Sequence, residues 1–205
     1  MKSIIIFFFI ISSSFLYCQT KIVDYYPLSI RNRWIYEITT FSNDTKMKME
    51  VEVIGYEETY QAFFVTSKMK PELYLPDMPF KEQLVISRNN KVLILSNRVA
   101  PMDTVWDIDT NRILIRYPIK VGTSWLSKEN SVDTAEYKVL SLSDIKVQAG
   151  QFKNVFKVKK GVLGRSDGPK DIFIYYAPNI GMIKSEIINE GRPQGVIELI
   201  SYTMK

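Results

Sequence analysis

Carboxylates are foremost among the side chains of this 205-residue chain that could perform acid–base chemistry. The sequence contains no histidine, which excludes a serine–histidine–aspartate triad and metal binding through imidazole. Two carboxylates at a suitable separation can cleave a glycosidic bond, and Glu57, Glu58 and Asp167 lie in segments with the composition of turns. No motif surrounds these three residues, so we expect no catalytic residue. A carboxylate-dependent hydrolase is the less favoured alternative.

Metal binding has one short candidate, the segment from Asp107 to Asn111. Its oxygen-bearing side chains stand at alternate positions, as at the start of a calcium-binding loop. The sixth and twelfth positions of such a loop require glycine and glutamate, and here they are Arg112 and Pro118. Cys18 is the only cysteine, which excludes paired-cysteine zinc sites. We therefore expect no metal and no cofactor.

A proline-rich, apolar segment from Lys70 to Phe80 is the candidate ligand-binding element. Its three prolines exclude it from a central strand, and surface loops are seldom this apolar. Burial at one end of the core is the simpler explanation in a small domain. The alternative is a flap over a hydrophobic pocket. The ligand would then contact the following side chains: Leu73, Tyr74, Leu75, Met78 and Phe80.

Alternation of apolar and polar residues predicts the elements that must position any site. The segment from Met47 to Val53 alternates apolar side chains with lysine and glutamate, and no segment has a convincing helical period. We predict an all-β, antiparallel protein with about eleven to twelve short strands in a curved open barrel or sandwich. The predicted strands are 33–40, 47–53, 60–67, 84–87, 92–95, 113–115, 135–142, 145–148, 152–159, 172–176, 182–188 and 196–202.

Turn residues separate these strands. The segment from Arg88 to Lys91 predicts a hairpin turn, and Gly150 stands at another. Pro178 and Gly181 lie early and late in a third turn, which their types specify well. We expect structural roles for these two residues and for Gly150. The segment 191–195 is predicted to separate off the last strand.

The basic residues are dispersed, although the net charge is +5. Their densest group alternates with Val155, Phe156 and Val158, as on a strand with one solvated face. We therefore expect a solvated strand surface and no nucleic-acid site. The lysines of this group are Lys153, Lys157, Lys159 and Lys160.

One phrase occurs twice in the chain, as YPLSIRNRW from Tyr26 to Trp34 and as YPIKVGTSW from Tyr117 to Trp125. Proline at its start fixes φ and suits a bend at the entry to a strand. We interpret each copy as a corner that starts a sheet segment and is held by a buried tryptophan. Ile30 and Val121 are also predicted to point inward. Gly122 gives the second copy freedom to turn, whereas the first copy has Arg31 at that position.

The first residues have the layout of a secretory signal peptide. A basic start is followed by an apolar run from Ile4 to Ile11 and then by serines. A membrane anchor needs about 20 apolar residues, and this run is shorter. We predict a signal peptide at 1–18 and a single β-rich domain at 19–205. Lipidation of Cys18 is less favoured, because the bulky Tyr17 precedes it.

Three segments resemble a family of exported bacterial β-rich envelope proteins. Tyr26–Tyr36 resembles its opening "(Y/F)-(Y/F)-P-L-x-x-G-N-x-W-x-Y", and Val147–Val155 resembles "V-x-A-G-x-F-x-N-V". Tyr175–Glu186 resembles the hairpin "Y-Y-A-P-G-V-G-L-V-K-x-E". Arg31 and Asn179 depart from this pattern, where the family has glycine. The resemblance implies an open β-barrel similar in outline to those of periplasmic lipoprotein carriers. It implies no catalytic residue.

These observations predict an exported, non-enzymatic envelope protein that binds a hydrophobic ligand or partner in a groove of a curved β-sheet. The alternative is a structural or surface-interaction domain with a filled core. The expected partner is a lipid or another envelope protein, not nucleic acid. No transmembrane span is expected after signal cleavage, and the sequence indicates no oligomeric state. The location would be the periplasm, the outer membrane surface or the extracellular space.

Overall fold

The structure is a computed structural model, and it describes residues 23–70, 80–100, 108–129, 133–163 and 170–205. These residues form twelve antiparallel strands, which confirms the predicted all-β class. Within the same residues there is no helix that could span a membrane. The strands are β1 (Arg33–Thr40), β2 (Thr45–Glu57), β3 (Ala62–Lys70), β4 (Phe80–Arg88), β5 (Lys91–Ala100), β6 (Ile113–Arg116), β7 (Ser124–Lys128), β8 (Thr134–Val147), β9 (Gly150–Leu163), β10 (Lys170–Ala177), β11 (Gly181–Asn189) and β12 (Arg192–Thr203).

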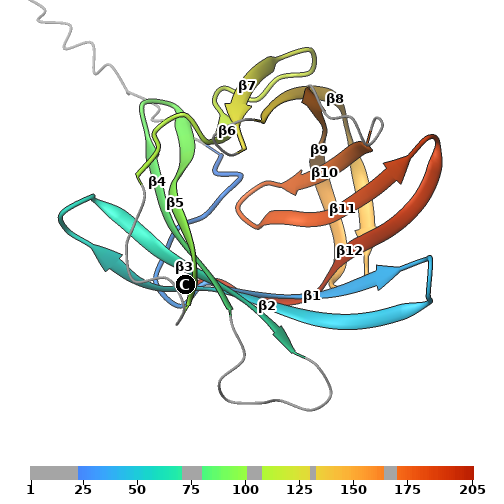
Figure 1. Ribbon diagram of the computed structural model, residues 1–205, viewed down its shortest axis with the longest axis horizontal. Helices are drawn as coiled ribbons and strands as arrows, with labels where there is room; N and C mark the ends of the chain where they lie inside the picture. Colours follow the sequence, from blue (N-terminus) through green and yellow to red (C-terminus); the bar gives the residue numbers. More distant parts are fainter. Residues whose placement is uncertain (1–22, 71–79, 101–107, 130–132, 164–169) are drawn as a thin grey trace, which may run out of the picture.

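All twelve strands belong to one sheet, which curls into a nearly closed barrel (Figure 1). Strands β1 to β6 form one up-and-down meander, and β7 to β12 form a second. The pairing of β1 with β12 joins the two meanders, so the order of strands repeats after six. The two edge strands, β6 and β7, lie close to each other and nearly complete the barrel.

Successive side chains of a strand point to opposite faces of the sheet, and the main core lies on the face inside the barrel. A smaller buried cluster, which includes Leu84 and Ile86, lies on the opposite face of β3 to β5. Val53 of β2 stands opposite Val65 of β3, and both are fully buried. The same holds for Val139 of β8 and Val158 of β9. Lys138, which precedes Val139, is exposed on the outer face. Alternation in the sequence therefore places apolar residues in the interior.

Two predicted boundaries are wrong. The segment 191–195 does not separate the last strand, because β12 begins at Arg192 and the chain turns at Glu190 and Gly191. Pro193 is tolerated in β12 because the pairing with β1 ends at Gly195, so Pro193 has β11 alone beside it. The predicted strands 135–142 and 145–148 are one strand, β8. Irregular pairing with β9 at Val139–Ser141 and Ser143–Ile145 interrupts its alternation.

The repeated phrase forms the same corner twice. Asn32 N–H donates to the carbonyl of Ser29 at 2.9 Å, and Thr123 N–H donates to the carbonyl of Lys120 at 3.0 Å. The next bond is also shared. Arg31 N–H donates to Val53 O at 2.8 Å, and Gly122 N–H donates to Val139 O at 2.9 Å. Each corner therefore joins the strand that follows it to the next strand of its meander. The matching bonds are as follows: Val53 N–H to Asn32 O, and Val139 N–H to Thr123 O.

The prediction that Ile30 and Val121 point inward is wrong, since they are 45% and 57% exposed. Each occupies a central position of the tight turn, where a side chain projects into solvent. The following residue has positive φ in both copies, 76° at Arg31 and 89° at Gly122. Glycine is favoured at such a position, and arginine in the first copy adopts the same conformation.

Exchanging the two corner residues should move stability in opposite directions. Arg31→Gly removes the steric cost of a left-handed conformation at arginine, and it also increases the conformational entropy of the unfolded chain, which offsets part of the gain. The free energy of unfolding should therefore rise by about 0.5–1 kcal/mol. Gly122→Arg should lower it by a similar amount, about 0.5–1 kcal/mol, because no atom lies within 4 Å of the added Cβ and backbone strain dominates. Urea denaturation measures both changes. Destabilisation by both substitutions would contradict this account.

Candidate functional site

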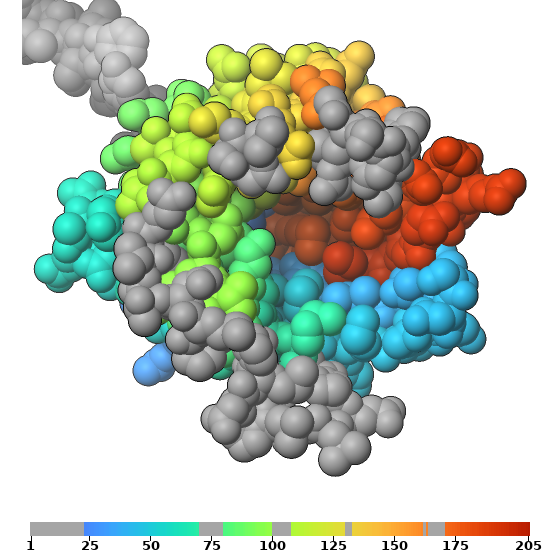
Figure 2. Space-filling view, viewed as in Figure 1, coloured from blue at the N-terminus to red at the C-terminus, as the bar shows by residue number. Residues whose placement is uncertain are grey.

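An apolar chamber of about 230 Å³ lies inside the barrel. Its lining comes from both meanders, and Figure 2 shows this face hollowed between the green surface of β4 and β5 and the orange-red surface of β10 and β11. We call it the apolar chamber. Its aromatic and methionine side chains are Tyr26, Trp34, Tyr36, Met49, Tyr176 and Met182.

The tyrosines of the apolar chamber are uncharged. Burial raises the pKa of Tyr26 to about 12 and raises the pKa of Tyr176 still further. Burial also raises the pKa of Tyr36 well above its usual value. The Tyr36 hydroxyl donates to the carbonyl of Met182 at 2.9 Å, which satisfies it inside the barrel. The chamber therefore offers neutral aromatic surface at any physiological pH.

A second chamber of about 190 Å³ adjoins the first and shares Gln83, Ile94 and Leu114 with it. We call it the cationic chamber. Gln83 Nε2 donates to Asn97 Oδ1 at 2.6 Å, from β4 to β5. Its remaining lining is mostly charged, in contrast to that of the apolar chamber. These residues include Lys81, Arg112, Lys128, Glu129, Tyr137 and Lys160.

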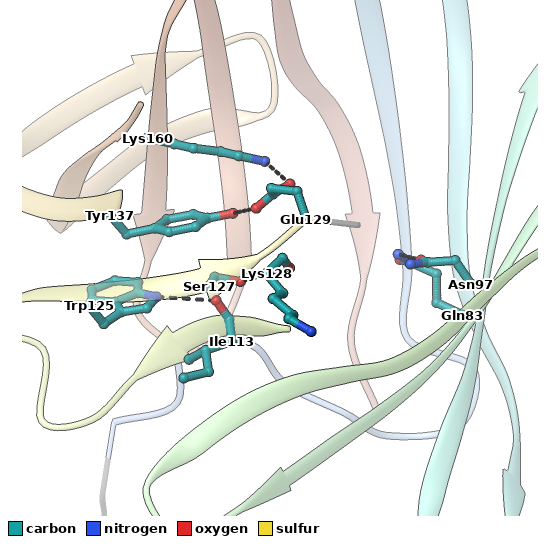
Figure 3. A network of polar contacts seen from close by, with 9 residues as sticks. All are labelled: Gln83, Asn97, Ile113, Trp125, Ser127, Lys128, Glu129, Tyr137 and Lys160. Atoms are coloured by element: carbon teal, nitrogen blue, oxygen red, sulfur yellow. Dashed lines mark hydrogen bonds and ion pairs between the residues drawn. The ribbon is translucent and has the colours of Figure 1, made fainter. Parts of the chain in front are cut away.

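Glu129 is held firmly in the cationic chamber (Figure 3). It accepts a hydrogen bond from the Tyr137 hydroxyl at 3.1 Å and an ion pair from Lys160 Nζ at 2.5 Å. Tyr137 in turn stacks on Trp125, with ring centroids 5.3 Å apart and planes 7° apart. Burial, and then the charge of Glu129, raises the pKa of Tyr137 and keeps it a donor. In Figure 3, Gln83 points toward this group across the chamber.

Three further cations line the cationic chamber. Within the described part of the chain, no carboxylate forms an ion pair with Lys81, Arg112 or Lys128. The Lys81 side chain reaches solvent, yet enough protein surrounds it to lower its pKa. Desolvation is the main cause, and repulsion from Lys160 comes next. The buried Nε of Arg112 has no hydrogen-bond acceptor among the described residues.

The residues predicted from the sequence to form a site lie elsewhere or outside the described residues. Leu73, Tyr74, Leu75 and Met78 fall outside them. Phe80 is half-buried at the start of β4, where Lys68 Nζ lies 4.6 Å from its ring centroid, and it does not line either chamber.

The five residues with predicted structural roles lie at corners and in the core. Trp34 and Trp125 are buried on the inner face, while Gly150 has a φ of 140° at the start of β9. Pro178 stands in the turn before β11. Gly181 follows this turn with a φ of 97° and lines the apolar chamber, where Trp34 Nε1 donates to the carbonyl of Ile180 at 2.6 Å. These contacts make the tryptophan of the first corner part of the chamber wall.

The carboxylates singled out from the sequence do not converge. Glu58 is exposed, and Glu57 accepts a hydrogen bond from the Thr59 amide in the turn after β2. Asp167 lies outside the described residues, as does Asp107 of the calcium-like segment. In the part of the chain that the structure describes, no group of three or more acidic residues could hold a metal ion.

Lys160 is the site residue for which the sequence prediction is wrong. The lysine-rich segment of β9 is predicted to have one solvated face. Lys160, however, stands opposite Tyr137 on the inner face, because it lies two residues after the fully buried Val158. The sequence could have shown this, because side chains two residues apart on a strand lie on the same face of the sheet. The other lining residues come from many strands, so no local motif marks them.

Comparison with known proteins finds two solved structures of low similarity and no family. No protein-family model and no curated protein matches the sequence. A candidate lipoprotein from Parabacteroides distasonis is 12% identical over 88% of this chain and 99% of its own, with a TM-score of 0.46. A candidate exported protein with a YmcC-like fold from Bacteroides fragilis is 13% identical over 89% of this chain and 100% of its own, with a TM-score of 0.46. Similarity this low transfers no residue role.

Proposed function

We propose that this protein is an exported, non-enzymatic envelope protein that binds a hydrophobic ligand inside its barrel. The observation that supports the proposal is the apolar chamber, with its neutral aromatic lining. Ligand sites are concave and are lined mainly by hydrophobic and aromatic side chains with a few polar groups. The apolar chamber, of about 230 Å³, has such a lining and opens onto one face of the molecule, so a ligand could enter it. It favours ligand binding over a structural domain with a filled core.

The chamber sets the size of that ligand. An apolar cavity of about 150 Å³ can bind benzene, so by the same ratio this chamber accommodates about nine carbons. Ligand sites usually span roughly 300–1,000 Å³, which the apolar chamber approaches only together with the adjoining cationic chamber. A single alkyl chain fits these limits better than a lipid with two long chains.

We propose a non-enzymatic protein because the described residues that line the two chambers lack the pair of carboxylates that a glycoside hydrolase needs. Hydrolysis of a glycosidic bond needs two carboxylates about 5–9.5 Å apart. Among the described lining residues, Glu129 is the only carboxylate of the cationic chamber, and Lys160 already pairs with it. The export step rests on the signal-like segment 1–18, which lies outside the described residues. The periplasm, the outer membrane surface and the extracellular space all agree with it, and a lipid anchor at Cys18 is less favoured.

Filling the apolar chamber should abolish binding. Met49 lines the chamber, and the preceding residue, Lys48, is exposed on the outer face of β2. We expect Met49→Trp to weaken binding of the neutral probe 1-nonanol at least about tenfold, since the indole takes the ligand's volume. Lys48→Trp adds the same side chain outside and should leave the affinity within about twofold of the unmodified protein, as expected for a surface position. Isothermal titration measures all three affinities.

Two results would count against the proposal. Equal 1-nonanol affinities for Met49→Trp and Lys48→Trp would place the probe outside the chamber. No 1-nonanol binding by the unmodified protein, together with a lipid-free organic extract of protein recovered from its native host, would favour the structural alternative. Mass spectrometry of that extract would also identify the natural ligand if one is bound.

A further inference from the structure

The cationic chamber begins where the apolar chamber ends. Gln83, Ile94 and Leu114 line both, so a chain that fills the apolar chamber and continues past these residues enters the cationic one. The end of such a ligand would meet charged side chains. The chemistry of that end can be inferred from the balance of charge around it.

The lining of the cationic chamber holds more positive than negative charge. Its four cations are Lys81, Arg112, Lys128 and Lys160, against the single carboxylate of Glu129. Glu129 is neutralised by Lys160 at 2.5 Å. Asp109 lies near this group, and its pKa is lowered by the Asn111 amide first and by Lys128 and Arg112 to a smaller extent. Its carboxylate accepts a hydrogen bond from that amide at 2.8 Å. An excess of positive charge remains with both acids counted.

This excess destabilises the empty chamber in a way that an anion would relieve. Lys160 repels Lys81, Glu129 offsets part of this repulsion, and Arg112 adds to it. The buried Arg112 Nε has no acceptor among the described residues. A donor buried without an acceptor is costly, and a hydrogen bond to an anion is about twice as strong as a neutral one.

Resting on the proposed function, we propose that the ligand is a single-chain amphiphile with an anionic headgroup, either a carboxylate or a phosphate. Its alkyl chain occupies the apolar chamber. Lys81 and Arg112 bind the headgroup in the cationic chamber, and Lys160 contributes while it also holds Glu129 in place. Gln83 lies at the junction between chain and headgroup.

Four probes that share a ten-carbon chain test this inference by isothermal titration: decanoate, decyl phosphate, 1-decanol and decyltrimethylammonium. We expect the tighter anion to bind about tenfold more strongly than 1-decanol, as for a charge-assisted hydrogen bond. Decyltrimethylammonium should bind most weakly. Comparing decanoate with decyl phosphate tells which anionic headgroup the chamber prefers, and a preference for either supports the inference.

Variants locate the headgroup. In Lys81→Gln/Arg112→Gln, the ratio of anion affinity to 1-decanol affinity should fall about tenfold, because the charge-assisted bonds are lost. Lys138→Gln is the matched control, since it removes one charge from the outer face of β8 beside Tyr137. Glu129→Gln should raise anion affinity about threefold by releasing Lys160, which keeps the inference testable should the double variant fail to fold.

The outcomes separate the two proposals. Equal affinities for the anions and for 1-decanol in the unmodified protein would overturn the headgroup inference and leave hydrophobic ligand binding intact. An unchanged affinity ratio in the double variant, or weaker anion binding by Glu129→Gln, would overturn it as well. Failure of all four probes to bind would instead contradict the proposed function itself.

Discussion

Replacing Trp125 with alanine should lower the free energy of unfolding by about 3–5 kcal/mol, as for other buried aromatic residues. Trp125 is only 4% exposed and stacks face to face on Tyr137. Its indole Nε1 also donates to the carbonyl of Ile113 at 3.2 Å. Truncation therefore removes apolar contact, a ring stack and a hydrogen bond together. This is the largest loss we expect from one truncation in the second meander.

The position of this bond adds to its effect. Ile113 begins β6 and Trp125 lies in β7, and these are the two edge strands of the sheet. A second bond, from Lys128 N–H to Asn111 O at 3.0 Å, spans the same edges. Trp125→Ala therefore weakens the closure of the barrel as well as its core. Strand edges freed in this way promote association between chains, so the variant should also aggregate more readily.

Urea denaturation and size-exclusion chromatography measure these two effects. Leu126→Ala is the control, because Leu126 is the next residue of β7 and is 58% exposed on the outer face. Its free energy of unfolding should change by less than about 0.5 kcal/mol. A change near zero for Trp125→Ala would show that the tryptophan is not held in the core, and would reopen a role for it in binding.

The hairpins of this fold could be predicted because their signals are local. The turn between β4 and β5 has Asn89 and Asn90 with φ values of 51° and 58°, a conformation that asparagine tolerates. The turn sets a direct register from Arg88 opposite Lys91 to Val85 opposite Ile94, and the irregular step beyond Val85 does not follow from it. Local turn chemistry and alternation thus predict neighbouring strands, although not every strand boundary.

The closure of the barrel could not be predicted in this way. The pairing of β1 with β12 places Arg33 beside Thr203, and no turn links strands so distant along the chain. The chambers depend on that closure. Met49 of β2 and Tyr176 of β10 line one wall only because the two meanders face each other. Side chains that meet through long-range pairing leave no spacing in the sequence to detect.

The repeated phrase sits between these two cases. Its residue types predict a corner, and the structure adds that the two corners occupy equivalent places in the two meanders. They are also linked, since the Tyr117 hydroxyl accepts a bond from Tyr25 N–H at 2.9 Å and donates to Asp24 at 3.0 Å. The sequences around the phrase do not match. The corner is therefore the part of the repeated six-strand arrangement that can be recognised from the sequence.

The seam between the two meanders provides the second large effect on stability. Gly195 of β12 stands opposite Thr40 of β1, and a Cβ built on it would lie 2.9 Å from the carbonyl oxygen of Thr39. That atom belongs to the backbone and cannot rotate away. Gly195→Ala must therefore push β1 from β12, which we expect to lower the free energy of unfolding by about 1–3 kcal/mol, the usual cost of overpacking.

Gly161→Ala is the matched control for this seam. Gly161 is also a strand glycine, in β9, and an added Cβ there meets no atom within 4 Å. Alanine at that position should leave stability unchanged or raise it by up to about 1 kcal/mol, because it restricts the unfolded chain. Thermal and urea denaturation of the pair separate contact at the seam from the general effect of replacing glycine. Equal stability changes in the two variants would mean that β1 and β12 yield at little cost, and that the barrel does not depend on their close approach.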